Sequence, residues 1–314
     1  MEQLKSVAIL GASGHLAQAV LKKLEHQAGL ERLLGVDVAP PLLHPAKLEY
    51  IAGDLRHAPL ESLFKGTETL LHLAVAPLLL RQLGQVQGVQ ESLKRVVYAA
   101  RTVGMKRVVV LTSGAAYGAH ADNPMPVQEW RPLRPNPGNL LAEGWCAIEQ
   151  TLESLRSEPE MPLLISMRSA YPLGPEVPRD RLQALTAEHV LLPLEPLAPI
   201  QLVHTEDLAC ALLAALSQGE RPVYHVAAAE PVTPRTLFEA ASVRVVSLPR
   251  SMLEMLSEAS HRLGQGRVLP DLLRLTRHPL LLSTVTIRHE LHWEPRFNTL
   301  ETFLDTRRAL RTEP

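Results

Sequence analysis

The chain has 314 residues, of which 46% are hydrophobic and 21% are charged, as in ordinary soluble globular proteins. This length is enough for one large α/β domain with extensions, or for two small domains, and for a buried core. The formal net charge of −1 gives no electrostatic argument for binding nucleic acid or an anionic membrane. We therefore expect neither of these partners.

Strands and helices are predicted to alternate through the first half of the chain. The β-type runs lie at 7–10, 33–38, 49–55, 69–75, 106–113 and 162–169. Helical patterns lie between them, and the two longest cover 84–104 and 139–155. This alternation predicts an α/β fold, in which a doubly wound parallel sheet carries helices on both faces.

The segment GASGHLA, residues 11–17, has the spacing of a dinucleotide-binding loop. It follows a strand and opens a helix, so that Gly11 permits a tight turn and Gly14 lets the backbone approach a pyrophosphate. Asp37 ends the second strand, where a carboxylate accepts from both ribose hydroxyls of NAD and repels the extra phosphate of NADP. The alternatives are a tight turn without a ligand and, at Asp37, an ordinary turn residue. We predict a Rossmann-type domain that binds NAD.

The regular alternation ends near residue 170, and most of the 26 prolines follow residue 120. A helix at 206–216 and a strand at 223–227 then resume the pattern. We expect residues 1–170 to form the NAD-binding domain, with 201–228 returning to it. Residues 171–200 and 229–314 are expected to form a smaller C-terminal lobe for a substrate or partner.

The order of motifs over nearly the whole chain resembles the extended short-chain dehydrogenases/reductases, the NAD-dependent epimerase/dehydratase family. The segments that carry the resemblance are VAILGASGHLA (7–17), AGDL (52–55), HLAV (72–75), LTSGAAYG (111–118), RSAYPLGP (168–175), VHTEDLA (203–209), YHVAAAEPVT (224–233) and HWEPRFNTLETF (292–303). The resemblance implies an NAD-dependent oxidoreductase, epimerase or dehydratase that acts on a nucleotide-sugar or a small carbonyl compound.

The resemblance also implies contacts with the cofactor. Asp54 would bond the adenine, Leu55 would pack against it, and the backbone of the HLAV segment would border the cofactor. The predicted cofactor-binding residues are Gly11, Ser13, Gly14, His15, Leu16, Asp37, Asp54, Leu55, Leu73, Ala74, Val75, Ser113 and Pro172.

The catalytic tyrosine and lysine of that family have no counterpart at the matching positions. In the family they form Y-x-x-x-K, and a glutamate follows four residues after the lysine. Glu149 supplies that glutamate, which assigns Leu141 to the tyrosine position and Trp145 to the lysine position. No tyrosine or lysine occurs from 118 to 170, so a one-residue slip does not restore the pair. Leu141 transfers no proton and Trp145 carries no charge, so the usual acid–base exchange is expected to be lost.

Two candidate catalytic residues remain. Ser113 is the serine of the family triad, and it can polarise a carbonyl by a hydrogen bond. Tyr171 occupies the place of the family's asparagine after the sixth strand and is the candidate for a relocated hydroxyl. The alternative is that Tyr171 only fills the pocket that asparagine would leave open. Tyr117 is interpreted as structural, and the loop residue His120 as a solvated group.

Several other features predict no separate chemistry. Cys146 and Cys210 follow no metal or disulfide spacing, which favours free thiols in a reducing, cytoplasmic setting. His204, Glu206 and Asp207 have no second cluster of metal ligands near them in the sequence. Thr205, Glu206 and Asp207 are interpreted as the cap of a helix N-terminus, so no metal is expected. The N-terminal residues do not resemble a signal peptide, and the apolar run at 70–80 is too short for a membrane span.

Two functions are therefore predicted. The favoured one is an NAD(H)-binding protein that has lost the usual redox chemistry. The alternative is an active NAD-dependent enzyme of this family with a relocated proton donor. A homodimer is expected, because family members commonly pair through the helices at 84–104 and 139–155, and because the second helix is unusually apolar at Leu140, Leu141, Trp145 and Ile148.

Overall fold

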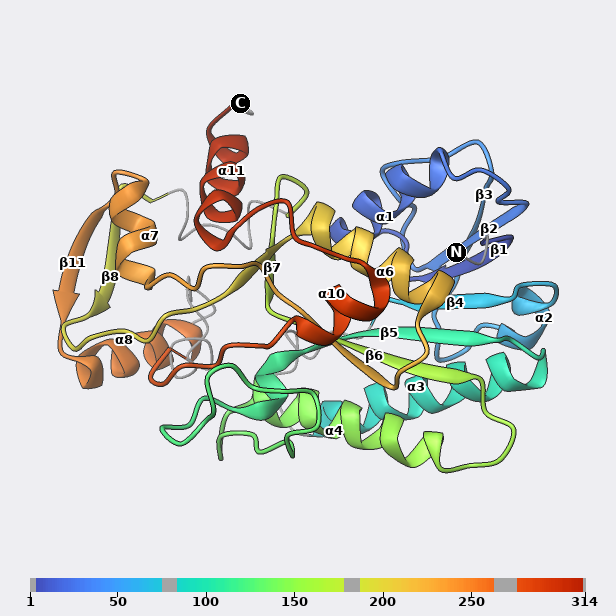
Figure 1. Ribbon diagram of the computed structural model, residues 1–314, viewed down its shortest axis with the longest axis horizontal. Helices are drawn as coiled ribbons and strands as arrows, with labels where there is room; N and C mark the ends of the chain where they lie inside the picture. Colours follow the sequence, from blue (N-terminus) through green and yellow to red (C-terminus); the bar gives the residue numbers. More distant parts are fainter. Residues whose placement is uncertain (1–3, 75–83, 178–186, 263–275, 313–314) are drawn as a thin grey trace.

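The computed structural model describes residues 4–74, 84–177, 187–262 and 276–312, and it is built on a parallel sheet of seven strands (Figure 1). The strands follow the spatial order β10-β6-β5-β4-β1-β2-β3, and every neighbouring pair is parallel. Their bounds are β1 Ser6–Leu10, β2 Arg32–Asp37, β3 Leu48–Ala52, β4 Thr69–His72, β5 Arg107–Ser113, β6 Leu163–Ser169 and β10 Val223–Val226. The predicted doubly wound parallel sheet is confirmed.

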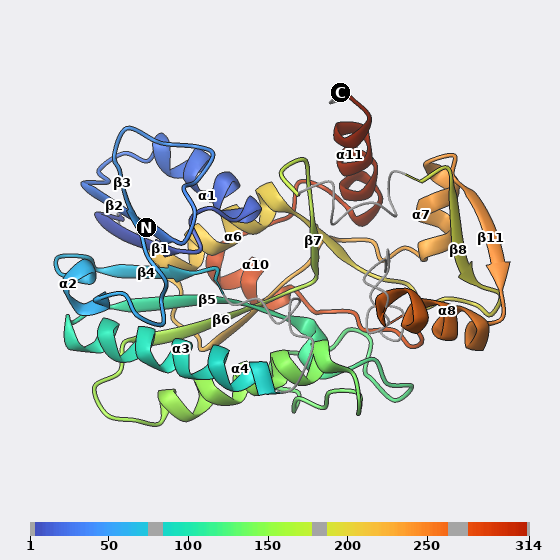
Figure 2. The same ribbon diagram turned by 180° about the vertical axis from the view of Figure 1, so that it is seen from behind.

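Helices cover both faces of this sheet (Figures 1 and 2). One face carries α1 (His15–Glu25) and α6 (Thr205–Gln218), and the other carries α2 (Leu60–Phe64), α3 (Gly84–Thr102) and α4 (Leu140–Arg156). Successive side chains of a strand point to opposite faces, so a strand that is covered twice must be apolar throughout. In β1, Val7 and Ile9 join the core under α1 and α6, whereas Ala8 and Leu10 join the core under α3 and α4.

The remaining elements are smaller. The strands β7 (Tyr171–Leu173) and β9 (Leu202–His204) form one parallel pair, and β8 (His189–Pro193) and β11 (Arg244–Leu248) form another. The helices are α7 (Pro234–Ala240), α8 (Arg250–Arg262), α10 (Val285–Leu291), α11 (Thr299–Thr312) and the short 3-10 helix η2 (Gly114–Tyr117). The group of α7, α8, β8 and β11 lies at the end of the molecule opposite α2 (Figures 1 and 2).

The packing joins segments of both predicted lobes. The strand β10 is part of the large sheet, and the helix α6 packs on that sheet. The helix α10 packs on both of them, and Ile287, Leu291 and Trp293 share the core under α1 and α6. The exact division of the chain stays a prediction. In the described part of the chain, no helix has the length and apolar character that crossing a bilayer requires.

The strand order determines where a ligand site can form. The chain winds outward from β1 in one direction through β2 and β3, and in the other direction through β4, β5 and β6. In such sheets ligands bind beyond the carboxyl ends of the strands, where the order reverses. At this place the backbone after β1 meets the backbone after β4, where Gly11 lies against Leu73 and Ala74.

Candidate cofactor site and active site

The loop after β1 is shaped so that only glycine fits at its first position. Gly11 has a φ of +86°, and a Cβ atom added there would lie 2.8 Å from the backbone nitrogen of Ala74. Gly14 caps the N-terminus of α1, and its N–H donates to the Gly11 carbonyl at 3.1 Å. The helix then begins at His15, and Leu16 is buried beneath the loop. A tight turn that leads into a helix N-terminus is the geometry that binds a pyrophosphate.

Asp37 is fixed beside this loop by three hydrogen bonds. Its Oδ2 accepts from the Ser13 N–H at 2.9 Å and from the Ser13 hydroxyl at 2.6 Å, and its Oδ1 accepts from the Val38 N–H at 2.7 Å. An ionised carboxylate has about four acceptor positions, so these three donors leave about one position for a ribose hydroxyl. The structure therefore brings together the glycine loop and the carboxylate that the sequence predicts for the same cofactor.

The turn after β3 carries the residues predicted to meet adenine. The Asp54 carboxylate accepts from the Arg56 N–H at 2.9 Å and from the Arg56 guanidinium, with Nη2 at 2.6 Å. Hydrogen bonds from Arg56 lower the pKa of Asp54 to about 2, so this carboxyl is an acceptor at neutral pH. Leu55 is partly buried against the core under α3. Leu73 and Ala74 follow β4 with their backbone beside Gly11, while Val75 lies outside the described residues.

Ser113 and Tyr171 lie at the ends of neighbouring strands. Ser113 ends β5, and its Cα is the register partner of Ser169, which ends β6. Tyr171 follows two residues later, and its side chain is 38% exposed. Pro172, the next residue of β7, is partly buried. The Ser113 hydroxyl accepts from the Ala115 N–H at 3.2 Å and thereby caps η2.

A chain of buried polar side chains runs behind these strand ends. Glu149 of α4 accepts from the Thr112 hydroxyl at 2.5 Å and from the Arg168 Nη2 at 2.8 Å. Arg168 also donates to the Tyr117 hydroxyl, which in turn lies 2.8 Å from the His225 Nε2. Each of these side chains therefore has at least one partner within the interior, while the Arg168 Nε and the His225 Nδ1 are buried without a hydrogen-bond partner among the described residues.

Burial sets the protonation states within this polar chain. It raises the pKa of Tyr117 to about 12 and lowers the pKa of His225 to about 3. Burial is the largest single influence on the pKa of Arg168 and acts to lower it, but the charge of Glu149 and the hydrogen bonds to Glu149 and Tyr117 together raise this pKa above its usual range. At neutral pH the chain thus consists of a neutral tyrosine, a neutral histidine and one buried ion pair.

The helix α4 directs Leu141 and Trp145 into the protein. Together with Glu149 they occupy positions four residues apart, which places them on one helix face. Leu141 is 6% exposed and Trp145 is 7% exposed, and both belong to the same core as Ala115 and Ala116 of η2. No later segment of the chain can supply the missing catalytic lysine, because Lys106 is the last lysine of the sequence. The predicted tyrosine and lysine positions are thus part of a packed apolar core.

The family model described as NAD dependent epimerase/dehydratase family matches residues 7–227 of the chain. The chain belongs to this family. NAD is the family's cofactor, and the glycine loop with its adjacent carboxylate has the groups that this cofactor needs. A search of curated proteins found no match.

Solved structures show the same fold in other proteins. MoeE5 in complex with UDP-glucose and NAD has a TM-score of 0.76 and 19% identity, and the match covers 98% of each chain. UDP-N-acetylglucosamine 4-epimerase from Methanobrevibacter ruminantium M1 also has a TM-score of 0.76, with 16% identity and 99% of each chain covered. TunA, an NAD dependent NDP-hexosamine 5,6-dehydratase, has a TM-score of 0.73, with 16% identity and 98% of each chain covered. At these identities the likeness is one of fold.

Two contacts near the strand ends carry no local signal in the sequence. Leu282 lies against Gly114, the residue after Ser113, so that a Cβ atom on Gly114 would meet the Leu282 side chain at 2.8 Å. Gln201 holds this leucine in place, because its Oε1 accepts from the Leu282 N–H at 2.6 Å. Both contacts join segments that lie far apart in the chain, so only the fold reveals them.

The segment HTEDLA begins a helix, as interpreted from the sequence, but the cap is a different residue. His204 is the N-cap of α6, and its Nδ1 accepts from the Glu206 N–H at 3.2 Å. Asp207 instead accepts from the backbone N–H groups of Arg296 and Phe297, both at 3.0 Å. The residues that the structure describes contain no cluster of histidine, cysteine and acidic side chains suited to a metal ion.

Most of the apolar residues that suggested a dimer are used within the chain. Leu141, Trp145 and Ile148 belong to the core under α3 and α4, while Leu140 is partly buried and is not part of that core. The exposed side of α3 carries polar and charged groups, among them Glu91, Arg95 and Tyr98. The apolar character of α4 therefore gives no argument for dimerisation, and the homodimer stays a prediction.

Proposed function

We propose that this protein is an NAD(H)-binding member of the epimerase/dehydratase family that lacks the family's tyrosine–lysine pair. When bound, NAD accepts or returns a hydride. In this proposal Gly11 and Gly14 admit the pyrophosphate, Asp37 accepts from the adenine ribose, and Asp54 with Leu55 borders the adenine. The nearby residues Ser13, His15, Leu16, Leu73, Ala74, Val75, Ser113 and Pro172 complete the proposed cofactor contacts.

The observation that carries the proposal is the buried pair of Glu149 and Arg168. The two side chains are 1% and 8% exposed, and their contact of 2.8 Å fixes the rotation of α4 against β6. Glu149 is also the residue that sets the register of the missing motif. With Glu149 facing inward, positions one and two turns earlier face inward too, and Leu141 and Trp145 occupy them. Neither side chain exchanges a proton at neutral pH, so a step worth about a hundred- to ten-thousand-fold in rate is missing.

A second candidate function is supported by the position of Tyr171. Ser113 and Ser169 are register partners, and Tyr171 follows Ser169 by two residues. The Tyr171 hydroxyl would then act as a relocated proton donor, with Ser113 polarising a carbonyl. The substrate in this case would be a nucleotide-sugar or a small carbonyl compound, in line with the nucleotide-sugars bound by the solved relatives.

The test is a turnover assay on NAD-loaded wild-type protein with UDP-glucose and dTDP-glucose. We expect no epimerised or dehydrated sugar and no accumulation of reduced cofactor. Turnover that disappears in Tyr171→Phe but persists in Tyr98→Phe would establish the second function and refute the first. Tyr98 is a suitable control because it lies on the outer side of α3 and is likewise partly exposed.

The remaining predictions concern assembly and location. We propose a homodimer in a cytoplasmic setting, in which Cys146 and Cys210 stay reduced. The dimer is tested by sedimentation of the purified protein with and without NAD. A monomer at all concentrations would contradict it without affecting the cofactor site.

A further inference from the structure

The turn that carries Asp54 and Leu55 is held from outside the predicted cofactor site by one arginine of α3. Arg95 donates from Nη1 to the Leu55 carbonyl at 2.7 Å and from Nη2 to the Ala58 carbonyl at 2.6 Å. Both carbonyls belong to the turn between β3 and α2. An arginine suits this role because its planar guanidinium presents two donors in a fixed geometry.

The turn itself is already well ordered by local hydrogen bonds. The Asp54 carbonyl accepts from the His57 N–H at 2.9 Å and from the Ala58 N–H at 2.8 Å. The Asp54 carboxylate is held by Arg56, as described above. These bonds fix the shape of the turn, and the Gly53 N–H ties its start to β2 by donating to the Asp37 carbonyl at 2.9 Å. Arg95 adds a link from the turn to α3, whose side chains Leu93, Val96 and Val97 are buried in the core.

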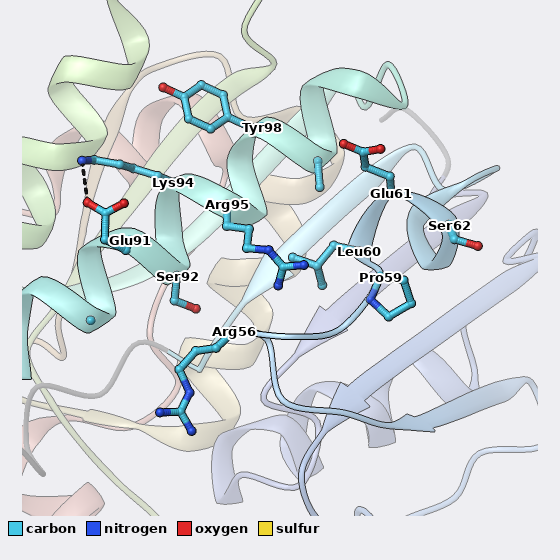
Figure 3. Close-up of a pocket in the computed structure, with 12 residues that line it drawn as sticks. Arg56, Pro59, Leu60, Glu61, Ser62, Glu91, Ser92, Lys94, Arg95 and Tyr98 are labelled. Carbon is cyan, nitrogen blue, oxygen red and sulfur yellow. Dashed lines mark hydrogen bonds and ion pairs between the residues drawn. The ribbon is translucent and has the colours of Figure 1, made fainter.

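The contact between Arg95 and the turn lies in the wall of a surface groove. A groove of about 850 Å³ runs between α2 and α3 and is lined by Arg56, Leu60, Glu91, Lys94, Arg95 and Tyr98, among others. Figure 3 shows Arg95 reaching from α3 toward the turn, whereas Lys94 and Tyr98 leave the same helix in other directions. Lys94 pairs with Glu91 at 2.9 Å on the helix surface. The neighbouring cation on this helix thus makes no contact with the turn.

We infer that Arg95 is a positioning residue for adenine recognition. It touches no part of the cofactor and acts by keeping the Asp54 carboxylate at the edge of the adenine site, where that carboxylate meets the 6-position of the base. The inference rests on the proposed function, because it requires that NAD binds with its adenine beside Asp54. An ionised carboxylate only accepts hydrogen bonds. It therefore favours adenine, whose 6-amino group donates, over hypoxanthine, whose 6-oxygen accepts.

The test compares two dinucleotides by calorimetric titration of the full chain: NAD and nicotinamide hypoxanthine dinucleotide. We expect wild-type protein to prefer NAD by about tenfold, the value of one hydrogen bond to a charged group. In Arg95→Ala, the Kd for NAD should rise by about three- to tenfold while the Kd for the hypoxanthine dinucleotide stays nearly constant. The preference for NAD is then lost. Arg95→Lys, which retains the charge and a single donor group, should recover part of the preference.

Lys94→Ala is the matched control and should leave both Kd values unchanged. An Arg95→Ala variant that binds both dinucleotides more weakly by the same factor would reduce Arg95 to a general structural residue and overturn the inference. Unchanged discrimination in Arg95→Ala would overturn it as well. If wild-type protein binds neither dinucleotide, the proposed function itself fails. If wild-type protein binds both equally well, the cofactor site stands and only the role of Asp54 and Arg95 is refuted.

Discussion

Two regions at the carboxyl edge of the sheet differ in what their polar side chains do. Around β1, β2 and β3, the carboxylates of Asp37 and Asp54 lie at the edge, where Asp37 is held by Ser13 of the loop after β1 and Asp54 by Arg56 of its own turn. Around β5, β6 and α4, the polar side chains Glu149, Arg168 and Tyr117 point inward and bond to one another. The first arrangement places carboxylates at the edge of the sheet, and the second turns its polar groups into the interior. We therefore expect cofactor binding and proton transfer to be separable in this protein.

The largest effect on stability is expected from Glu149→Ala. Removing one partner of a buried ion pair leaves the other charge uncompensated and costs about 3–5 kcal/mol in the free energy of unfolding. Urea denaturation measures the difference. Glu153→Ala is the control on the same helix, because its pair with Arg156 is exposed at Glu153 and contributes about 0–1 kcal/mol. A loss below about 1 kcal/mol in Glu149→Ala would show that the ion pair does not fix α4.

A smaller and more local effect is expected from Gly11→Ala. The substitution forces a Cβ atom against the Ala74 backbone and places alanine at a positive φ, which costs about 1–3 kcal/mol from strain alone. NAD affinity should fall to an undetectable level, because the loop must move away from β4. Calorimetry and thermal unfolding check the two effects.

Gly104→Ala is the control that separates the effect of backbone strain at a positive φ from the effect of the contact with Ala74. Gly104 also has a positive φ, +74°, but an added Cβ atom there meets nothing within 4 Å. We expect this variant to lose stability through the same backbone strain and to bind NAD as the wild type does. If the two variants weaken NAD binding equally, the loop after β1 is not the cofactor site.

The effect with the smallest expected change per pH unit concerns the buried histidine His72. Burial lowers the pKa of His72 to about 4, whereas an unfolded histidine titrates near pH 6.5. The unfolded chain then binds more protons between these values, so stability is fully present above about pH 6.5 and is lost as the pH falls toward about 4. Replacing His72 by glutamine should reduce the slope of the free energy of unfolding against pH by about 1.4 kcal/mol per pH unit within this window. Denaturation curves across the window test the change, and an unaltered slope would contradict it.

The sequence predicts the sheet and the glycine loop because both depend on local patterns. Short apolar runs that alternate with helical patterns along the chain predict the strands. The spacing of Gly11, Gly14 and Ala17 directly after a strand predicts the turn. The roles of Arg95 and Leu282 could not be predicted, because their contacts span 37 residues or more and have no spacing rule. The dimer argument from α4 failed for a related reason. Composition shows that a helix is apolar, but only packing shows which surface covers it.

The central claim is that the chain holds NAD through the groups at the edge of β1 and β2. Calorimetric titration of the purified protein with NAD, after removal of any bound nucleotide, tests it most directly, with Asp37→Ala alongside. Asp122→Ala is the control, because that carboxylate lies in an exposed loop and pairs with Arg134. We predict one NAD per chain with micromolar affinity or better for wild type and for Asp122→Ala, and a Kd at least about tenfold higher for Asp37→Ala. Absence of NAD binding to the wild type, or equal binding to Asp37→Ala, would contradict the account.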